Sequence, residues 1–282
     1  MSTVAELRRQ GRRRLADSAA ATGPREATLL LSRVLGLSEA QLLARSEQPV
    51  SSRHAAQYGT LLERRAAGEP VAYLLGEREF YGRSFLVDRR VLIPRPETEH
   101  LVEVTLDLVS GAPASVLDVG TGSGCIAVTL AVEAPNLTVF ASDVSLDALD
   151  VARSNCRRLA GPGAVCLFAC DLLDGLDLGI IDLVVSNPPY LAPGEAAAMT
   201  PDVLEHEPHL ALFAPPDGLA QLRRLLRGAR GLRPGATLAL EVGAAQAPQV
   251  AELAGEQFEV ARIERDYAGH ERVVCLRRRA PR

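Results

Sequence analysis

The chain has 282 residues, of which 47% are hydrophobic and 23% are charged, and its net charge is −4. These values are typical of a globular protein large enough to bury a sizeable core, and the length favours one large and one small domain. No apolar run approaches the roughly 20 residues of a membrane-spanning helix, and the N-terminal stretch MSTVAELRRQGRRRLADS lacks the apolar centre of a secretion signal. We therefore expect a cytoplasmic location and no membrane partner.

The charge is unevenly distributed along the chain. Residues 1–95 carry 16 Arg against 10 Asp and Glu, a balance of +6, whereas the remainder carries 15 Arg against 25 Asp and Glu, a balance of −10. The N-terminal part can therefore attract an acidic partner or RNA, or its arginines can simply form the solvated faces of amphipathic helices. The composition leaves both interpretations open.

The cysteines give no sign of a metal centre or of disulfide bonds. They are odd in number and show no paired CxxC spacing, which favours reduced structural thiols. They are Cys125, Cys156, Cys166, Cys170 and Cys275. We expect no metal.

Helical patterns dominate the first part of the chain, up to about residue 70. Four stretches carry apolar residues at spacings of three and four and are separated by Gly, Pro and Ser, which predicts a small helical bundle over residues 1–75. The following stretch alternates around Gly82 and predicts a β-hairpin linker over residues 76–95. Pro96 with the acids behind it indicates the start of a helix, and so the start of a domain covering residues 96–282.

The third region, residues 96–282, alternates between strand and helix patterns. Buried apolar strands that alternate with helices predict an α/β fold, a parallel sheet covered by helices on both faces. The last two strands are close together in the sequence, so we expect at least that pair to be antiparallel. The expected strands are SVLDVG, LTVFASD, AVCLFAC, IIDLVVS, ATLALEVG, FEVARIER and ERVVCLRRR. Such sheets bind ligands at the carboxyl ends of their strands.

Three alternating glycines follow the first of these strands. Gly120, Gly122 and Gly124 lack a Cβ, so the backbone can approach a ligand closely and direct its N–H groups at it. Gly122, Gly124 and Ala127 also match a loose G-x-G-x-x-A dinucleotide pattern, and a tight turn without a ligand is a further alternative. The glycines alone therefore predict a ligand-binding turn without naming the ligand.

Acidic residues end the next two strands. Asp143 ends the second strand, where a carboxylate can accept hydrogen bonds from both ribose hydroxyls of an adenosine, or can cap the helix that starts near Ser145. Asp171 ends the third strand, where it can meet the adenine edge with Leu172 beside the ring, or be a plain loop acid. These residues favour an adenosine-bearing cofactor, and both NAD and S-adenosylmethionine satisfy them.

The sequence SNPPY at the end of the fourth strand distinguishes the two cofactors. The Asn187 side-chain oxygen and the Pro188 carbonyl form a pair of acceptors suited to a planar NH2 group; Pro189 keeps the segment rigid, and Tyr190 offers a flat face. This arrangement suits methyl transfer from S-adenosylmethionine to an amide or amine nitrogen, and a nicotinamide enzyme has no use for it. The alternative is a Pro-rich strand exit without function.

Longer stretches carry a family resemblance. DVGTGSG with NPPY resembles the class I, Rossmann-like, seven-stranded methyltransferases that act on planar nitrogen. YLLGEREFYGRSFLVDRRVLIPRPETEHLV, SNPPY and EHEPHLALFAPPDGL resemble the HemK/PrmC family over essentially the whole chain. The resemblance implies a helical substrate-recognition domain before the methyltransferase domain. It also implies transfer of a methyl group from S-adenosylmethionine, leaving S-adenosylhomocysteine, to N5 of the glutamine in the GGQ motif of class 1 peptide chain release factors.

The resemblance also implies roles for individual residues. Asn187, Pro188, Pro189 and Tyr190 would bind the glutamine amide and be catalytic, and Arg95 and Glu97 of PRPETE would position the substrate near the mouth of the site. The cofactor-binding set would be Gly120, Thr121, Gly122, Ser123, Gly124, Asp143, Asp171, Leu172 and Asn187. Some family members have an aromatic residue where this chain has Leu172, which puts adenine stacking there in doubt.

Three other functions compete with this prediction. A glutamine methyltransferase acting on a ribosomal protein would share the chemistry, and an N6-adenine nucleic-acid methyltransferase would share the clamp for an NH2 group. The second needs a basic groove for a flipped base, and the balance of −10 over residues 96–282 argues against nucleic acid as a partner. A non-catalytic binding module has no physical need for Asn187 and Tyr190.

Overall fold

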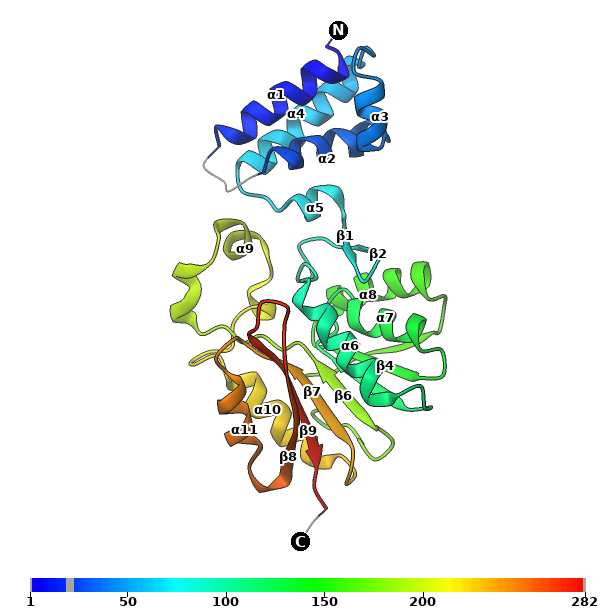
Figure 1. Ribbon diagram of the computed structural model, residues 1–282, viewed down its shortest axis with the longest axis vertical. Coiled ribbons are helices and arrows are strands. Elements are labelled where there is room, and N and C mark those ends of the chain that lie inside the picture. The colour runs from blue at the N-terminus through cyan, green and yellow to red at the C-terminus, as the bar shows by residue number, and fades with distance from the viewer. Residues whose placement is uncertain (1, 19–22, 281–282) are drawn as a thin grey trace. The chain divides into compact units, whose positions relative to one another are not determined.

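The computed structural model describes residues 2–18 and 23–280, and the chain divides into two compact units (Figure 1). The first consists of Met1–Glu77 with Ala198–Glu207, and the second of Arg78–Ala197 with Pro208–Arg282. The predicted hairpin linker thus groups with the larger unit from residue 78 on, and a short segment from the C-terminal half of the chain groups with the helices. The domain boundaries at residues 75 and 95 stay a prediction.

The first unit is helical. Side-chain caps begin two of its helices: Thr3 and Glu6 form a capping box at one, and Ser38 and Gln41 form the same arrangement at another. Its core contains Tyr58, whose hydroxyl donates to the Ala27 carbonyl oxygen at 3.0 Å. The helices are α1 (Val4–Ala16), α2 (Pro24–Leu35), α3 (Glu39–Ala44), α4 (Ser52–Ala66), α5 (Val71–Leu75) and α9 (Pro201–His206).

The second unit contains a seven-stranded sheet in the order β5-β4-β3-β6-β7-β9-β8, and a separate hairpin. The first five strands of that order run parallel, while β9 is antiparallel to both of its neighbours, β7 and β8. The hairpin strands are β1 (Glu77–Phe80) and β2 (Arg83–Leu86). The sheet strands are β3 (Ser115–Val119), β4 (Thr138–Asp143), β5 (Val165–Ala169), β6 (Leu183–Ser186), β7 (Thr237–Glu241), β8 (Phe258–Arg265) and β9 (Glu271–Arg278). The predicted α/β sheet, including its antiparallel final pair, is confirmed.

Helices cover both faces of this sheet because alternate strand residues point to opposite sides. Val116 and Val185 pack toward α6, α7 and α8, whereas Leu117 and Val184 pack toward α10 and α11 (Figure 1). The bounds are α6 (Glu97–Val109), α7 (Cys125–Glu133), α8 (Leu146–Leu159), α10 (Ala220–Gly228) and α11 (Ala247–Ala254), with short 3-10 turns at Pro193–Ala198, His209–Ala211, Ala229–Gly231 and Gly255–Gln257. None of the described helices is long and apolar enough to cross a membrane.

Candidate active site

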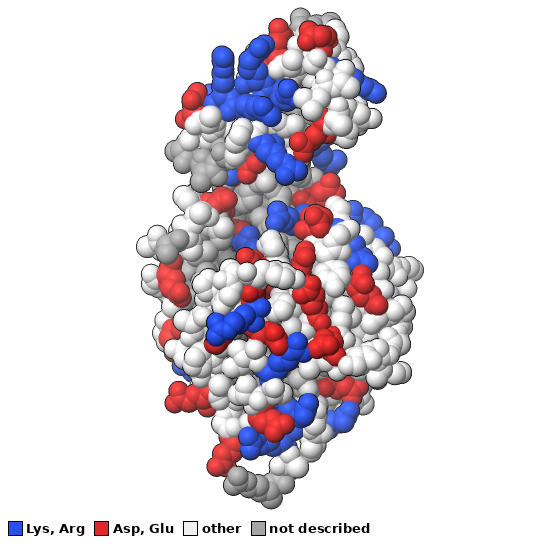
Figure 2. Space-filling view, viewed as in Figure 1, with Lys and Arg blue, Asp and Glu red and all other residues white. Residues whose placement is uncertain are grey.

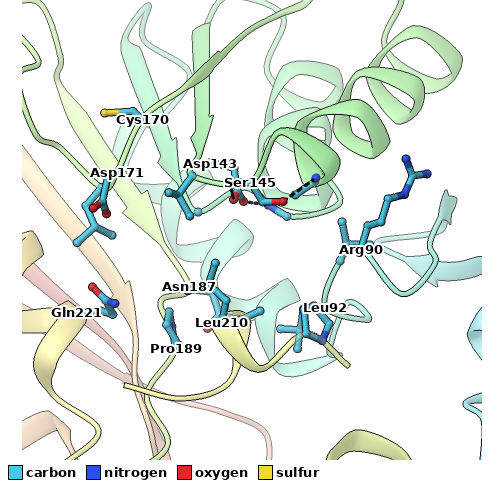
Figure 3. A pocket seen from close by; sticks show the side chains of 18 of the residues that line it. Arg90, Leu92, Asp143, Ser145, Cys170, Asp171, Asn187, Pro189, Leu210 and Gln221 are labelled. Carbon is cyan, nitrogen blue, oxygen red and sulfur yellow. Dashed lines mark hydrogen bonds between the residues drawn. The ribbon is translucent and has the colours of Figure 1, made fainter. Parts of the chain in front are cut away.

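A cavity of about 300 Å³ lies in the larger unit at the carboxyl ends of the parallel strands (Figure 3). This volume is at the lower end of the range of small-molecule sites. The cavity brings together seven of the residues that the sequence predicts: Gly120, Gly122, Asp143, Asp171, Leu172, Asn187 and Pro189. Segments from four strand ends therefore meet where the sheet topology predicts a ligand.

The glycine turn joins β3 to α7, and its three glycines serve two purposes. All three have positive φ values, 74° at Gly120, 56° at Gly122 and 80° at Gly124. A Cβ atom on Gly120 or Gly122 would meet nothing within 4 Å, so both leave backbone open to the cavity. On Gly124 it would lie 3.2 Å from the Cα atom of Ala152, so that glycine allows α7 and α8 to pack closely.

The N–H groups of this turn do not point freely into the cavity. Those of Gly120 and Thr121 donate to the Ser142 carbonyl oxygen at 2.8 and 2.9 Å, and that of Gly122 donates to the Asp143 side chain at 2.9 Å. The expectation that these amides are directed at a ligand is therefore wrong for these three residues. They tie the turn to the end of β4, and close approach of the backbone is what the glycines contribute.

Two predicted cofactor-binding side chains, those of Thr121 and Ser123, are buried in the protein and do not line the cavity in the described structure. The Thr121 hydroxyl donates to Asp118 Oδ2 at 2.7 Å, and the Ala127 N–H donates to the same oxygen at 3.2 Å. Asp118 is fully buried, and burial raises its pKa to about 7. Asp118 lies inside the strand pattern SVLDVG, where no role was predicted for it. It stabilises the glycine turn through these two hydrogen bonds.

Asp143 lies at the cavity wall with both carboxylate oxygens engaged. Oδ2 accepts from Gly122 N and Oδ1 from Ser145 N, each at 2.9 Å (Figure 3). Ser145 itself is the N-cap of α8, and its hydroxyl accepts from Ala148 N at 3.2 Å. The alternative role of Asp143 as the helix cap is thus taken by Ser145, and each Asp143 oxygen can still accept a further hydrogen bond.

Asp171 and Leu172 line the cavity side by side after β5. Asp171 Oδ2 accepts from Arg224 Nη2 at 2.9 Å, and the same guanidinium contacts Asp174 at 2.9 Å. Leu172 adopts φ 54°, an uncommon conformation for a residue with a side chain. Asp171 is therefore an ion-paired acid at the rim, and the backbone at Leu172 is held in a strained turn that keeps its side chain at the cavity.

Asn187 follows directly on β6, and in Figure 3 it lies with Pro189 across the cavity from Asp143 and Ser145. Its side-chain nitrogen Nδ2 donates to the Thr98 hydroxyl oxygen at 3.1 Å. Pro188 is buried and does not reach the cavity among the described lining residues. The amide nitrogen of Asn187 is thus bonded to the protein, which leaves the oxygen to face the cavity.

The backbone behind Tyr190 is tightly packed. Its carbonyl oxygen accepts from Gln246 Nε2 at 2.9 Å, while Gln246 Oε1 accepts from Gly243 N at 3.0 Å. Gly218 has φ 78°, and a Cβ atom there would clash with the Tyr190 carbonyl oxygen. The NPPY segment is therefore held from behind by two other loops.

The Tyr190 ring, although half-buried, does not line the cavity in the described structure. Burial raises the pKa of its phenol; Glu241 and Glu97 also raise it, whereas Arg272 and Arg95 lower it. Arg95 and Glu97 of PRPETE therefore act electrostatically on Tyr190 and lie on this side of the site, away from the cavity lining.

The remaining cavity walls come from loops and from helices α8 and α10, and the sequence predicted no cofactor or substrate contact for these residues. Among the described residues, no group of three or more His, Cys, Asp and Glu side chains is placed to hold a metal ion. The additional lining residues are Arg90, Val91, Leu92, Val144, Ser145, Ala148, Cys170, Pro208, Leu210, Ala211, Gln221 and Arg224. These residues are hard to predict from the sequence because they lie in segments that are far apart in the chain and come together only in the folded protein.

Comparison with known proteins decides the family. Residues 6–76 match the PrmC N-terminal domain, and residues 98–208 match the methyltransferase small domain. The chain is 46% identical over 232 residues to the release factor glutamine methyltransferase of Burkholderia pseudomallei (strain K96243), covering 80% of this chain and 81% of that one. It is 37% identical over 283 residues to that of Nitratidesulfovibrio vulgaris, covering 98% and 96%. The chain belongs to the release factor glutamine methyltransferase family.

This release factor glutamine methyltransferase family member also has the expected fold among solved structures. A methyltransferase from Pyrococcus furiosus has a TM-score of 0.53 and 18% sequence identity, and the match covers 79% of this chain and all of that one. At 18% sequence identity, this similarity supports the fold and nothing about the function. Family membership confirms the predicted resemblance to HemK/PrmC proteins and the predicted class of methyltransferase, whereas the roles of single residues stay predictions.

Proposed function

We propose that this enzyme transfers a methyl group from S-adenosylmethionine to the side-chain nitrogen N5 of the glutamine in the GGQ motif of class 1 peptide chain release factors, in the cytoplasm. The observation that carries the proposal is the Asn187 carboxamide, which faces Asp143 across the cavity in a chain whose relatives are release factor glutamine methyltransferases. The Asn187 carboxamide is suited to binding an amide, and the Asp143 carboxylate is suited to binding a ribose. Both residues line the same small cavity.

The cavity fits an adenosine-bearing cofactor with a cationic amino acid part. Gly120 and Gly122 line the cavity, and because their N–H groups are already bonded, their carbonyl oxygens would be the backbone groups left to bind a ligand. An ammonium group needs such acceptors. Asp143 has lone pairs for the ribose hydroxyls, and Asp171 with Leu172 would border the adenine. S-adenosylmethionine supplies the electrophilic methyl group when bound.

The chain's own contribution to the reaction is to hold a planar amide. Asn187 Oδ1 would accept one hydrogen of the glutamine NH2 group in the cavity. The Pro188 carbonyl oxygen and the Tyr190 ring, which do not line that cavity in the described structure, would accept the second hydrogen and pack on the amide plane beside it. An amide nitrogen is a poor nucleophile because its lone pair is delocalised. Fixing both hydrogens aims the nitrogen at the methyl group and stabilises the positive charge that develops on it. The nitrogen then releases one proton to water, so no strong general base is required.

The helical unit would contribute substrate recognition. Figure 2 shows arginine side chains gathered over the helical part of the molecule. Those of α1 are Arg8, Arg9, Arg12, Arg13 and Arg14. We propose that this unit binds the release factor, with Arg95 and Glu97 positioning the GGQ segment. Full activity of a variant lacking residues 1–75 on intact release factor would contradict this role.

One labelling experiment tests the proposed function. The protein is incubated with labelled S-adenosylmethionine and, in separate reactions, with a release factor, a ribosomal protein extract and duplex DNA, and the label is located by mass spectrometry. We expect label on the GGQ glutamine. Label on DNA or on a ribosomal protein glutamine, with none on the release factor, would overturn the proposal, and no label in any reaction would favour a binding module.

A further inference from the structure

Glu241 is a buried carboxyl group beside Asn187 to which the predicted chemistry gives no role. It ends β7, and because Ser186 of β6 pairs with Leu240 of β7, the next residues along the two strands, Asn187 and Glu241, lie next to each other. The Glu241 side chain is 1% exposed, and its Oε2 atom has no hydrogen-bond partner among the described residues. Buried carboxyl groups are costly, so one at this place calls for an explanation.

The orientation of the Asn187 carboxamide matters because its two ends have opposite hydrogen-bonding character. Nδ2 can only donate, and Oδ1 can only accept. The Asn187 carboxamide, which is proposed to hold the substrate NH2 group, must present Oδ1 to the cavity. In the reverse orientation the NH2 group of Asn187 would face the NH2 group of the substrate, and neither could accept a hydrogen bond from the other. The two orientations have nearly the same shape, so packing alone does not select between them.

Thr98 and Glu241 supply the selection. Thr98, in the first turn of α6, is 2% exposed, and its hydroxyl oxygen accepts from Asn187 Nδ2 at 3.1 Å. Hydrogen bonding from Thr98 and from the Asn187 side chain lowers the pKa of the Glu241 carboxyl group, which lies at the end of the neighbouring strand β7. An ionised carboxylate has no hydrogen to donate, so the NH2 end of Asn187 must turn toward it and away from the cavity.

We propose that Glu241 and Thr98 are positioning residues that fix the Asn187 carboxamide with its nitrogen toward the protein and its oxygen toward the substrate amide. This inference rests on the proposed function, because it supplies the orientation which that function needs. It links three segments far apart in the sequence, the starts of α6 and of the NPPY loop and the end of β7.

The charge state of Glu241 then becomes part of the mechanism. Burial raises its pKa to about 7, Glu97 adds to the rise, and hydrogen bonding from Thr98 and Asn187 and the positive charge of Arg272 oppose it. Burial raises the pKa of Tyr190 and of Cys125, and the charge of Glu241 adds a smaller rise to each, so both stay neutral near pH 7. When Glu241 is protonated, its carboxyl O–H can donate a hydrogen bond. It could then donate to Asn187 Oδ1, so it no longer excludes the reversed orientation of the Asn187 carboxamide. Methyl transfer should therefore fall as pH drops through about 7.

The test separates positioning from folding with matched substitutions. Glu241→Gln and Thr98→Val remove the carboxylate and the hydroxyl at nearly constant size, and Thr98→Ser restores the hydroxyl. Thr105→Val is the control, because Thr105 is similarly buried on the same helix and its hydroxyl donates to the Leu101 carbonyl oxygen of that helix. Turnover on release factor, affinity for S-adenosylmethionine and thermal unfolding are measured for each variant.

We expect Glu241→Gln and Thr98→Val to lower kcat by roughly tenfold or more while the cofactor affinity stays within about twofold, and Thr98→Ser and Thr105→Val to stay within about threefold of the parent in kcat. The fall in kcat on the acid side should vanish in Glu241→Gln. Unchanged kcat in Glu241→Gln and Thr98→Val, or an equal loss in the Thr105→Val control, would overturn the inference.

A second readout needs no methyl transfer, so it distinguishes failure of this inference from failure of the proposed function. The side-chain NH2 signals of Asn187, assigned by their disappearance in Asn187→Ala, should exchange slowly with solvent in the parent protein and faster in Thr98→Val and Glu241→Gln. Fast exchange in the parent would overturn the inference even if the enzyme methylates release factor. Slow exchange without any methylation would instead leave the positioning intact and overturn the function.

Discussion

Two buried carboxyl groups stand at strand ends on either side of the site, and they are held in different ways. Asp118 and Glu241 are both almost inaccessible to solvent, and burial raises the pKa of each to about 7. Asp118 accepts hydrogen bonds from Thr121 and Ala127, three and nine residues further along the chain. Glu241 instead faces Thr98 and Asn187, from distant segments.

Two carboxyl groups that are equally buried can therefore have different roles, one in the stability of the fold and one in catalysis. The partners of Asp118 belong to the turn that it supports, so its loss should damage folding first. Each acid leaves one carboxylate oxygen without a hydrogen-bond partner among the described residues, so the difference lies in the partners of the other oxygen. Glu241 acts on Thr98 and Asn187 from distant segments, so its loss should damage turnover first. The following changes are ordered from the largest expected effect to the smallest.

Asn187→Ala should have the largest effect, because it removes the acceptor that Glu241 is proposed to orient. We expect kcat for release factor to fall by at least about 100-fold, with the affinity for S-adenosylmethionine little changed. Asp143→Ala should do the reverse and weaken cofactor binding first. Calorimetric titration with the cofactor and single-turnover assays check both, and equal loss of cofactor affinity in the two variants would contradict the division between the two sides of the cavity.

Asp118→Ala should destabilise the protein by about 3 kcal/mol, because the Thr121 hydroxyl and the Ala127 N–H lose their shared acceptor in a buried place. Urea unfolding measures the free energy of unfolding. Asp118→Asn, which keeps one acceptor oxygen, is the matched control and should lose less. If Asp118→Ala were as stable as the parent protein, the turn would not depend on this acid.

The free energy of unfolding should fall as pH rises from about 4.5 to about 7. In that window Asp118 and Glu241 keep their protons in the folded state, whereas their unfolded counterparts have lost them, so the folded state binds more protons and rising pH favours unfolding. Each group should contribute roughly 3–4 kcal/mol. Urea titrations between pH 5 and pH 8 check this, and Glu241→Gln should flatten the slope while losing activity. An unchanged slope in that variant would mean that Glu241 ionises normally.

Gly124→Ala and Gly122→Ala should separate the two uses of the glycine turn. A Cβ atom at Gly124 meets Ala152 and requires a strained φ of 80°, so we expect a loss of about 1–2 kcal/mol in stability. Gly122, with φ 56°, carries similar backbone strain, but its Cβ atom would meet nothing within 4 Å and the residue lines the cavity, so stability should fall less than at Gly124 and cofactor affinity should fall as well. Thermal unfolding and cofactor titration of both variants check this, and identical behaviour would show that the glycines share one role.

Local patterns were enough to predict the sheet, the glycine turn and the acids at strand ends. Apolar runs reveal buried strands, and alternating glycines reveal a turn with positive φ, because both depend on residues close in the sequence. The same logic predicted that Asp143 and Asn187 lie near one cavity, since the carboxyl ends of parallel strands share one edge. It also placed Thr121 and Ser123 among the cofactor-binding residues, although their side chains are buried in the protein.

Partnerships between distant segments could not be predicted in this way. Asp171 pairs with Arg224, 53 residues away, and Thr98 meets Asn187, 89 residues away. Glu241 gave one available signal, because it ends its strand as Asp143 does, but its nearness to Asn187 depends on β7 lying beside β6. Strand order is a property of the whole fold, and no local pattern encodes it.

The close packing behind Tyr190 limits how this enzyme can be redesigned. Gly218 leaves no space between its backbone and the Tyr190 carbonyl oxygen, and Gln246 holds the same oxygen from another loop. A library that varies position 218 should therefore return few folded members, whereas a substitution at position 190 keeps the carbonyl oxygen that Gly218 and Gln246 contact. Attempts to give the enzyme a larger acceptor substrate should leave Gly218 and Gln246 intact and enlarge the cavity at Leu92 or Leu210.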